Sequence, residues 1–213
     1  MAFRIVIGDV TIGIQGQDFA YIFSVGMGGM ESLYKDGKEW LYRAPRPAFW
    51  RAATDNDRGN GFVFRSAVWS AADRFVRCVK VTARMDEQEI SMPPAPENNK
   101  YNGDKTCDRF EISYTYETPT VPVTEVTVSY LVESDGRIHV QVDYLGKQGL
   151  PELPVLGLRF LMPTAAEGYT YEGLSGETYP DRMAGGIHGV YEVQGLPVTP
   201  YMVPQDCGMH MQT

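Results

Sequence analysis

Hydrophobic and polar residues alternate with a period of two along much of the chain, which is the pattern of half-buried β-strands. Asp36-Gly37 and Asp135-Gly136 each separate two such segments, and Asp-Gly is a strong signal for a tight hairpin turn. We therefore predict antiparallel strands at Arg4–Ile7, Thr11–Ile14, Phe19–Ser24, Met30–Tyr34, Glu39–Arg43, Val76–Ile90, Phe110–Glu117, Val123–Glu133, Arg137–Tyr144 and Val155–Met162.

Apolar residues recur at helical spacing in one place, between Ala67 and Arg77, where Ser66 is suited to cap a helix. We predict a short helix there. Pro45 and Pro47 predict an extended, irregular segment over Ala44–Trp50, and the polar stretch Ser91–Asp104 predicts a loop. Many strands joined by tight turns, with one short helix, predict an all-β sandwich.

Charge and composition narrow the class of protein. The formal net charge is −8, and we find no cluster of basic residues in the sequence, which excludes a typical nucleic-acid binder. No apolar run reaches the roughly 18 residues of a membrane-spanning helix, and the N-terminus lacks the apolar stretch of a signal peptide. The three cysteines, Cys78, Cys107 and Cys207, show neither disulfide nor metal spacing, so we expect a cytoplasmic protein.

The densest polar motif is Arg51–Gly61, with the sequence RAATDNDRGNG. One interpretation is a metal loop, but the ligand spacing of a calcium loop is not continued beyond Asp57. A second is a pair of glycosidase carboxylates, because Asp55 and Asp57 would lie about 7 Å apart on one side of an extended segment. We favour a third, a buried turn whose carboxylates are satisfied by backbone N–H groups and by Arg51 or Arg58.

A second motif covers Tyr171–Arg182, YEGLSGETYPDR, in which glycines and a proline predict a wandering loop. It is no nucleophile elbow, because Glu177 stands where that motif needs glycine. Three acidic residues, Glu172, Glu177 and Asp181, could bind sugar hydroxyls or simply fix the loop. The three histidines, His139, His188 and His210, have no serine or cysteine partner in a recognisable triad motif, so we predict no catalytic residue in this chain.

Aromatic residues are frequent between positions 40 and 69. They suit either a platform on which a sugar ring stacks or, more commonly, core packing. The residues concerned are Trp40, Tyr42, Phe49, Trp50, Phe62, Phe64 and Trp69.

Two long segments resemble a known family. FWRAATDNDRGNGF at Phe49–Phe62 and YEGLSGETYPDRMAG at Tyr171–Gly185 are similar to signature segments of the β-galactosidase small chain, the C-terminal module of glycoside hydrolase family 2 β-galactosidases. EWLYR at Glu39–Arg43 and the last 19 residues, Gly195–Thr213, fit as well. The resemblance spans nearly the whole chain, and it implies a large antiparallel β-sandwich of the galactose-mutarotase-like kind, with residues 1–213 as one domain.

The resemblance also implies a division of labour. In this family the catalytic glutamates and the ligands for Mg²⁺ and a monovalent cation belong to a barrel in the large chain, and nothing here is similar to them. We therefore expect no metal and no cofactor in this chain, and β-galactosidase activity only in an assembly with the large chain or barrel domain. The family module continues past Thr213, and Met209–Thr213 still alternates as in a strand, so we expect a longer natural module.

Residues are carried over from the family in two groups. The first is a structural motif made of Arg51, Asp55, Asn56, Asp57, Arg58, Tyr179, Pro180, Asp181 and Arg182. The second is a segment that the resemblance places at the rim of the sugar pocket, made of Gly59, Asn60, Gly61, Phe62, Val63, Phe64 and Arg65. Since glycine tolerates φ > 0, Gly59 and Gly61 are expected to act as hinges of a gate.

Two functions remain open on the sequence alone. The first is an accessory module that completes a retaining glycosidase acting on terminal β-D-galactosides such as lactose. The second is a stand-alone carbohydrate-binding module, which requires an exposed aromatic platform. The first instead predicts a large apolar patch on which a partner docks.

Overall fold

The structure is a computed structural model that describes residues 2–92, 105–175 and 186–195. It divides into two compact units. The first consists of Met1–Arg51 and Arg65–Pro163, and the second of Ala52–Phe64 and Thr164–Thr213. Each unit is described here by itself.

The first unit begins with an antiparallel meander that forms a six-stranded sheet in the order β5-β4-β3-β2-β1-β9. Alternate residues of its inner strands, such as Ile5, Ile14 and Phe23, are buried, as the period of two requires. The strands are β1 (Phe3–Ile7), β2 (Thr11–Gln15), β3 (Phe19–Ser24), β4 (Gly29–Lys35), β5 (Lys38–Glu39) and β9 (Lys105–Cys107).

Strand β5 is shorter than the predicted segment Glu39–Arg43, and the Glu39 side chain explains why. Its Oε1 atom accepts hydrogen bonds from the backbone N–H groups of Leu33 at 3.0 Å and Leu41 at 2.8 Å. Its Oε2 atom accepts the Ser32 hydroxyl. Partial burial opposes ionisation of Glu39, but these hydrogen bonds outweigh it and lower the pKa of the carboxyl group. The Glu39 carboxylate therefore accepts the backbone N–H groups of Leu33 and Leu41 in place of strand-to-strand hydrogen bonds, and strand β5 ends here.

A second antiparallel sheet has the order β12-β11-β10-β7-β8. In β10 and β11 buried residues alternate strictly with less buried ones, so each strand presents one face to the core. Its strands are β7 (Arg77–Met85), β8 (Gln88–Ile90), β10 (Arg109–Glu117), β11 (Glu125–Glu133) and β12 (Ile138–Asp143).

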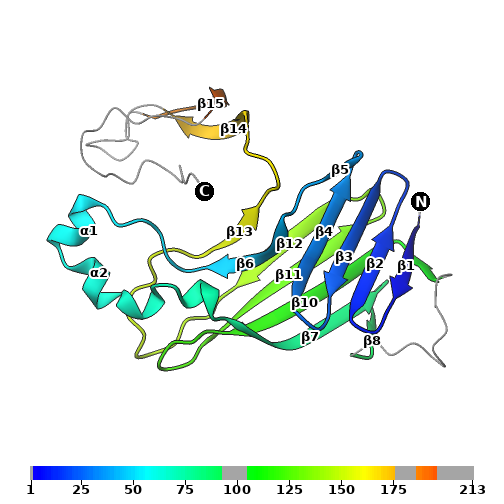
Figure 1. The fold of residues 1–213 in the computed structure, drawn as a ribbon, viewed down its shortest axis with the longest axis horizontal. Coiled ribbons are helices and arrows are strands. Elements are labelled where there is room, and N and C mark those ends of the chain that lie inside the picture. The colour runs from blue at the N-terminus through cyan, green and yellow to red at the C-terminus, as the bar shows by residue number, and fades with distance from the viewer. Residues whose placement is uncertain (1, 93–104, 176–185, 196–213) are drawn as a thin grey trace. The chain divides into compact units, whose positions relative to one another are not determined.

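The core lies between these two sheets, whose strands cross in Figure 1. Phe23 of β3 packs against Phe110 of β10 and Tyr130 of β11, with ring centroids 5.8 and 5.7 Å apart. At another point the Tyr21 hydroxyl donates a 2.6 Å hydrogen bond to the Gly136 carbonyl. Burial raises the pKa of Tyr21 to about 12, so this donor stays protonated. The predicted all-β sandwich is confirmed.

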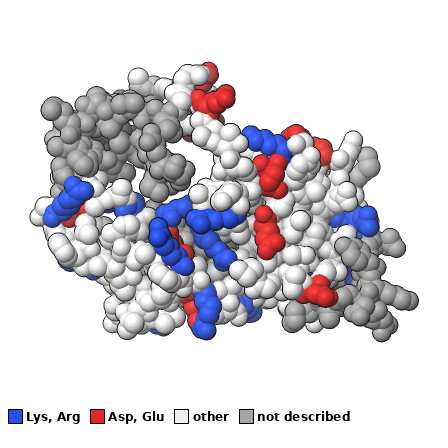
Figure 2. Space-filling view, in the orientation of Figure 1, with Lys and Arg blue, Asp and Glu red and all other residues white. Residues whose placement is uncertain are grey.

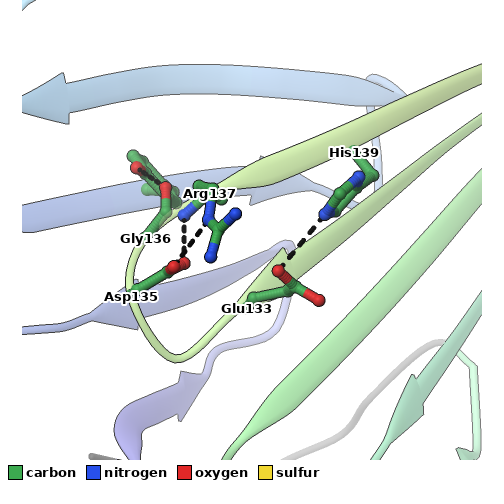
Figure 3. A network of polar contacts seen from close by, with 6 residues as sticks. Glu133, Asp135, Gly136, Arg137 and His139 are labelled. Atoms are coloured by element: carbon green, nitrogen blue, oxygen red, sulfur yellow. Dashed lines mark hydrogen bonds and ion pairs between the residues drawn. The ribbon is translucent and has the colours of Figure 1, made fainter.

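The turn that joins β11 to β12 carries a polar network, shown in Figure 3. The Asp135 carboxylate accepts hydrogen bonds from the backbone N–H of Arg137 at 3.0 Å and from its Nε atom at 2.6 Å. Gly136 has φ +79°, a left-handed conformation that favours glycine. The predicted Asp-Gly hairpin is confirmed here, and Asp36-Gly37 forms the corresponding turn between β4 and β5.

A third, two-stranded sheet pairs β6 (Arg43–Ala48) with β13 (Gly157–Leu161). The irregular course predicted for Ala44–Trp50 is therefore wrong up to Ala48. Pro47 lies opposite Leu158 in a strand that has one partner only, and an edge strand tolerates residues without a backbone N–H.

The helix predicted over Ala67–Arg77 is also wrong. The chain forms two 3₁₀ turns instead, η1 (Ala67–Trp69) and η2 (Ala72–Arg74), separated by Ala71 in the left-handed region at φ 60°. Both Trp69 and Ala72 are buried, and β7 already begins at Arg77. Tertiary packing of Trp69 thus overrides the local helical spacing.

The described part of the second unit contains two short helices and one hairpin. The helices are α1 (Asp55–Gly59) and α2 (Phe62–Arg65), whose last residue falls in the first unit. The hairpin pairs β14 (Gly168–Ser175) with β15 (Ile187–Gln194) in antiparallel register. The predicted wandering loop from Tyr171 onward is therefore wrong as far as Ser175. Tyr171 stacks on Tyr191 across the hairpin, with ring centroids 5.5 Å apart.

Candidate functional site

The Asp-Asn-Asp motif forms the first turn of helix α1, and side chains cap the N-terminus of this helix. The Thr54 hydroxyl accepts the backbone N–H of Asp57 at 3.2 Å, and the Asp57 carboxylate accepts the backbone N–H of Thr54 at 2.9 Å. This reciprocal pair is a capping box, which satisfies two N–H groups that have no partner within the helix. Asp57 is 8% exposed, so its carboxylate serves the helix start.

The other members of this motif lie around the same turn. Arg51 is half-buried just before the helix, while Asn56 and Arg58 are exposed on it. Asp55 is the first residue of α1, and its backbone alone is described. Tyr179, Pro180, Asp181 and Arg182 lie outside the described residues, as does Glu177. The joint structural role of these nine positions stays a prediction.

The predicted rim segment is helical over most of its length. Gly59 is the last residue of α1, Asn60 caps that helix, and Gly61 at φ 73° turns the chain into α2. The Asn60 side chain accepts the backbone N–H of Phe62 at 2.8 Å. Of the two proposed hinges, only Gly61 occupies the left-handed region. A substitution at Gly59 would be unstrained, since an added Cβ meets nothing within 4 Å.

The aromatic residues of positions 40–69 have separate environments. Phe49 and Trp69 are fully buried, and Trp50 packs against the core. The Trp40 ring lies under Lys38 Nζ at 4.3 Å, while its Nε1 donates to the Lys35 carbonyl. The most exposed rings are Tyr42 at 74% and Phe64 at 84%. Three of the seven rings, Phe49, Trp50 and Trp69, therefore serve core packing, as the commoner interpretation predicts.

Candidate metal and nucleophile residues are dispersed. Within residues 2–92, 105–175 and 186–195, no three His, Cys, Asp or Glu side chains are close enough together to hold a metal ion. The Nε2 atom of His139 lies 3.2 Å from Oε2 of Glu133. Cys78 and Cys107 are free thiols. In that same part of the chain no helix is long and apolar enough to cross a membrane.

One surface was missed by the sequence analysis. Arg43 and Arg46 of β6, Arg74 of η2 and Arg159 of β13 line a single hollow of about 900 Å³ in the first unit. In Figure 2 basic side chains gather in the middle of the face shown. The sequence contains no run of basic residues, but the fold brings these arginines together from distant segments into one basic cluster. Arg43 and Arg46, three residues apart, were the one local signal.

Comparisons with known proteins agree on one family. Residues 15–213 match the family described as "Beta galactosidase small chain". The chain is 59% identical over 209 residues to a β-galactosidase small subunit from Latilactobacillus sakei, which covers 98% of this chain and 66% of that one.

Longer relatives match over the same region. Identity is 38% over 190 residues to a β-galactosidase from Clostridium acetobutylicum, covering 89% of this chain and 19% of that one. Identity is 32% over 212 residues to a β-galactosidase from Streptococcus thermophilus, and this match covers 99% of this chain and 19% of that one. The chain thus spans about two thirds of the small subunit and about a fifth of the two longer proteins.

Proposed function

Because this chain belongs to the β-galactosidase small chain family, we propose that it is the non-catalytic part of a β-galactosidase and acts together with a catalytic large chain. The observation that carries the proposal is the similarity to a β-galactosidase small subunit over 98% of this chain. The assembled enzyme would hydrolyse terminal β-D-galactosides such as lactose by a retaining mechanism, with both carboxylates, Mg²⁺ and a monovalent cation held by the large chain.

The side chains of this chain support an accessory role. The Asp57 carboxylate is held by the capping box, and Asp73 is paired with Arg159 at 2.7 Å. Phe49 and Trp69, two of the aromatic residues considered for a sugar platform, are buried. These residues build a scaffold, and they favour the accessory module over a stand-alone carbohydrate-binding module.

The isolated chain is expected to leave a chromogenic β-galactoside unhydrolysed and to raise the activity of the catalytic large chain by roughly two orders of magnitude. That is the scale on which correct positioning of substrate groups affects a rate. The measurement is a titration of the large chain with this chain, followed by initial rates. Bovine serum albumin at equal concentration is the control for nonspecific stabilisation.

Two results would contradict the proposal. One is turnover by the purified chain alone. The other is calorimetric binding of galactose or lactose to the isolated chain without any effect on the large chain, which would favour the stand-alone binding module.

We further propose that Gly59–Arg65 forms part of the rim of the sugar pocket and moves as a gate. The segment leaves a capped helix through Gly61, and its α2 residues contain no buried side chain, with Phe64 84% exposed. Full burial of a phenyl ring contributes about 1.5–3 kcal/mol, while ordering one residue costs about 1–2 kcal/mol. Burial of one phenyl ring is thus comparable to ordering one residue, so closure of the gate would depend on how many side chains of the segment become buried.

Two substitutions that bias α1 in opposite directions test the gate. Asp57→Ala removes the carboxylate half of the capping box while the hydrogen bond from the backbone N–H of residue 57 to Thr54 remains, and it is expected to cost the helix about 1 kcal/mol. Gly59→Ala stabilises a helical residue by about 0.5–1 kcal/mol and meets no neighbour. We expect the KM for lactose of the assembled enzyme to shift in opposite directions in the two variants.

Val10→Ala, at a 61% exposed position between β1 and β2, is the control and should leave kinetics unchanged. The gate proposal fails if kcat and KM stay the same in both variants while hydrogen exchange shows that the stability of α1 has changed.

A further inference from the structure

The hollow lined by Arg43, Arg46, Arg74 and Arg159 is called here the arginine groove. It lies wholly within the first unit, where β6 and β13 pair and η2 packs beside β6. The Tyr42 backbone N–H donates to the Leu161 carbonyl at 2.8 Å and extends the pairing at its end. The hydrogen-bonded pairing of β6 with β13 therefore forms part of the groove wall, with a register shift between Arg159 and Leu161.

Two of the four arginines are fixed in place. Arg46 donates from Nη2 to the Met27 carbonyl at 3.0 Å, and its guanidinium lies 5.5 Å from the centroid of the Tyr116 ring. Arg159 forms an ion pair with Asp73, whose side chain is only 11% exposed. These contacts hold two guanidinium groups in the groove.

The other two arginines, Arg43 and Arg74, are exposed, and their guanidinium groups can interact with a ligand. Across the part of the chain that the structure describes, no carboxylate lies within ion-pair distance of Arg43 or Arg74. The groove contains two acidic residues, Glu31 and the already paired Asp73. Four guanidinium groups against two carboxylates leave a net positive surface, although the whole chain has a net charge of −8.

Apolar side chains lie beside this charge. Met27 is 70% and Tyr42 74% exposed, and both line the groove. A small inorganic anion would use the guanidinium groups alone. An extended peptide segment would use both features, with carboxylates on Arg43 and Arg74 and an apolar side chain against Met27 or Tyr42.

We propose that the arginine groove is a docking site for an acidic, extended segment of the catalytic large chain. The identity of the partner rests on the proposed function, whereas the preference for an acidic peptide rests on the groove alone. Charge complementarity carries the choice of occupant, because a net positive groove binds a negatively charged segment better than a neutral or basic one.

The first experiment tests the groove without the large chain. A fluorescently labelled octamer of glutamate is titrated with the full chain at low and at high salt. We expect binding that weakens with salt and is at least about tenfold weaker in the double variant Arg43→Glu/Arg74→Glu. The double variant Lys80→Glu/Arg84→Glu changes net charge equally at exposed positions of β7 and should bind like the wild type. Circular dichroism verifies that both variants fold.

Three outcomes would overturn the acidic-peptide assignment. The wild type fails to bind the octamer, both double variants weaken binding equally, or inorganic phosphate competes as strongly as the octamer, which would indicate a small-anion site. Sedimentation of the chain alone adds a fourth. A dimer that Arg43→Glu/Arg74→Glu dissociates would assign the groove to a second copy.

The second experiment uses the large chain. Arg43→Glu/Arg74→Glu is expected to raise the Kd of assembly at least about tenfold, whereas Lys80→Glu/Arg84→Glu leaves it unchanged. If the wild type does not assemble with the large chain, the proposed function fails and the octamer result still stands. If the wild type assembles and the groove variant assembles equally well, the docking proposal fails and the proposed function is untouched.

Discussion

A Trp69→Ala variant is expected to lose about 3–5 kcal/mol of unfolding free energy, the range observed when a buried aromatic side chain is truncated. Trp69 is fully buried in η1. Its ring packs against Phe49 and Tyr144, with centroids 5.5 and 6.1 Å away, and its Nε1 donates to the Pro151 carbonyl at 3.2 Å. Truncation leaves a cavity and an unpaired acceptor together.

Urea denaturation followed by tryptophan fluorescence and circular dichroism measures the loss. Phe75→Ala, a few residues away and 69% exposed, is the control and should change stability by about 0.5 kcal/mol or less. Equal losses in the two variants would mean that the η1 segment does not anchor the core as described.

Gly136→Ala is expected to destabilise the chain by about 2–5 kcal/mol. Part of this, roughly 1–2 kcal/mol, is the strain of an alanine at φ +79°. The rest is overpacking of about 1–3 kcal/mol, because a Cβ would lie 2.5 Å from the Phe19 ring. Phe19 is buried and stacked on Tyr21 at 4.9 Å, so it has little room to move.

Gly37→Ala separates these two contributions. Gly37 has the same φ of +79° in the other Asp-Gly turn, but nothing lies within 4 Å of its added Cβ. It should show the strain alone, roughly 1–2 kcal/mol. Thermal and urea unfolding of both variants provide the comparison. Similar losses at the two glycines would show that the turn does not press against Phe19.

Local pattern was sufficient to predict most of the two large sheets. The alternation in Phe110–Glu117 and Val123–Glu133 matches β10 and β11 within two residues at each end. Each of these strands has one buried face, so the period of two appears directly in the sequence. The Asp135-Gly136 hairpin is equally local, because its conformation depends on the turn residues themselves.

The features that the sequence did not predict correctly depend on contacts between distant segments. The helical spacing near Ala67 is genuine, but Trp69 is drawn into the core and Ala71 adopts a left-handed conformation. Strand β6 contains two prolines and exists because β13 pairs with it. The arginine groove could not be predicted for the same reason, since Arg46 and Arg159 meet only after that pairing.

The pairing of β6 with β13 also sets the order in which surfaces become available during synthesis. Strand β6 emerges early, yet its partner follows the entire second sheet, so their contact has a high sequence separation and closes late. The arginine groove therefore comes into being only when the first unit is complete. A partner that recognises the groove would bind completely folded molecules in preference to nascent or misfolded ones. Only correctly folded chains would then be incorporated into the assembly.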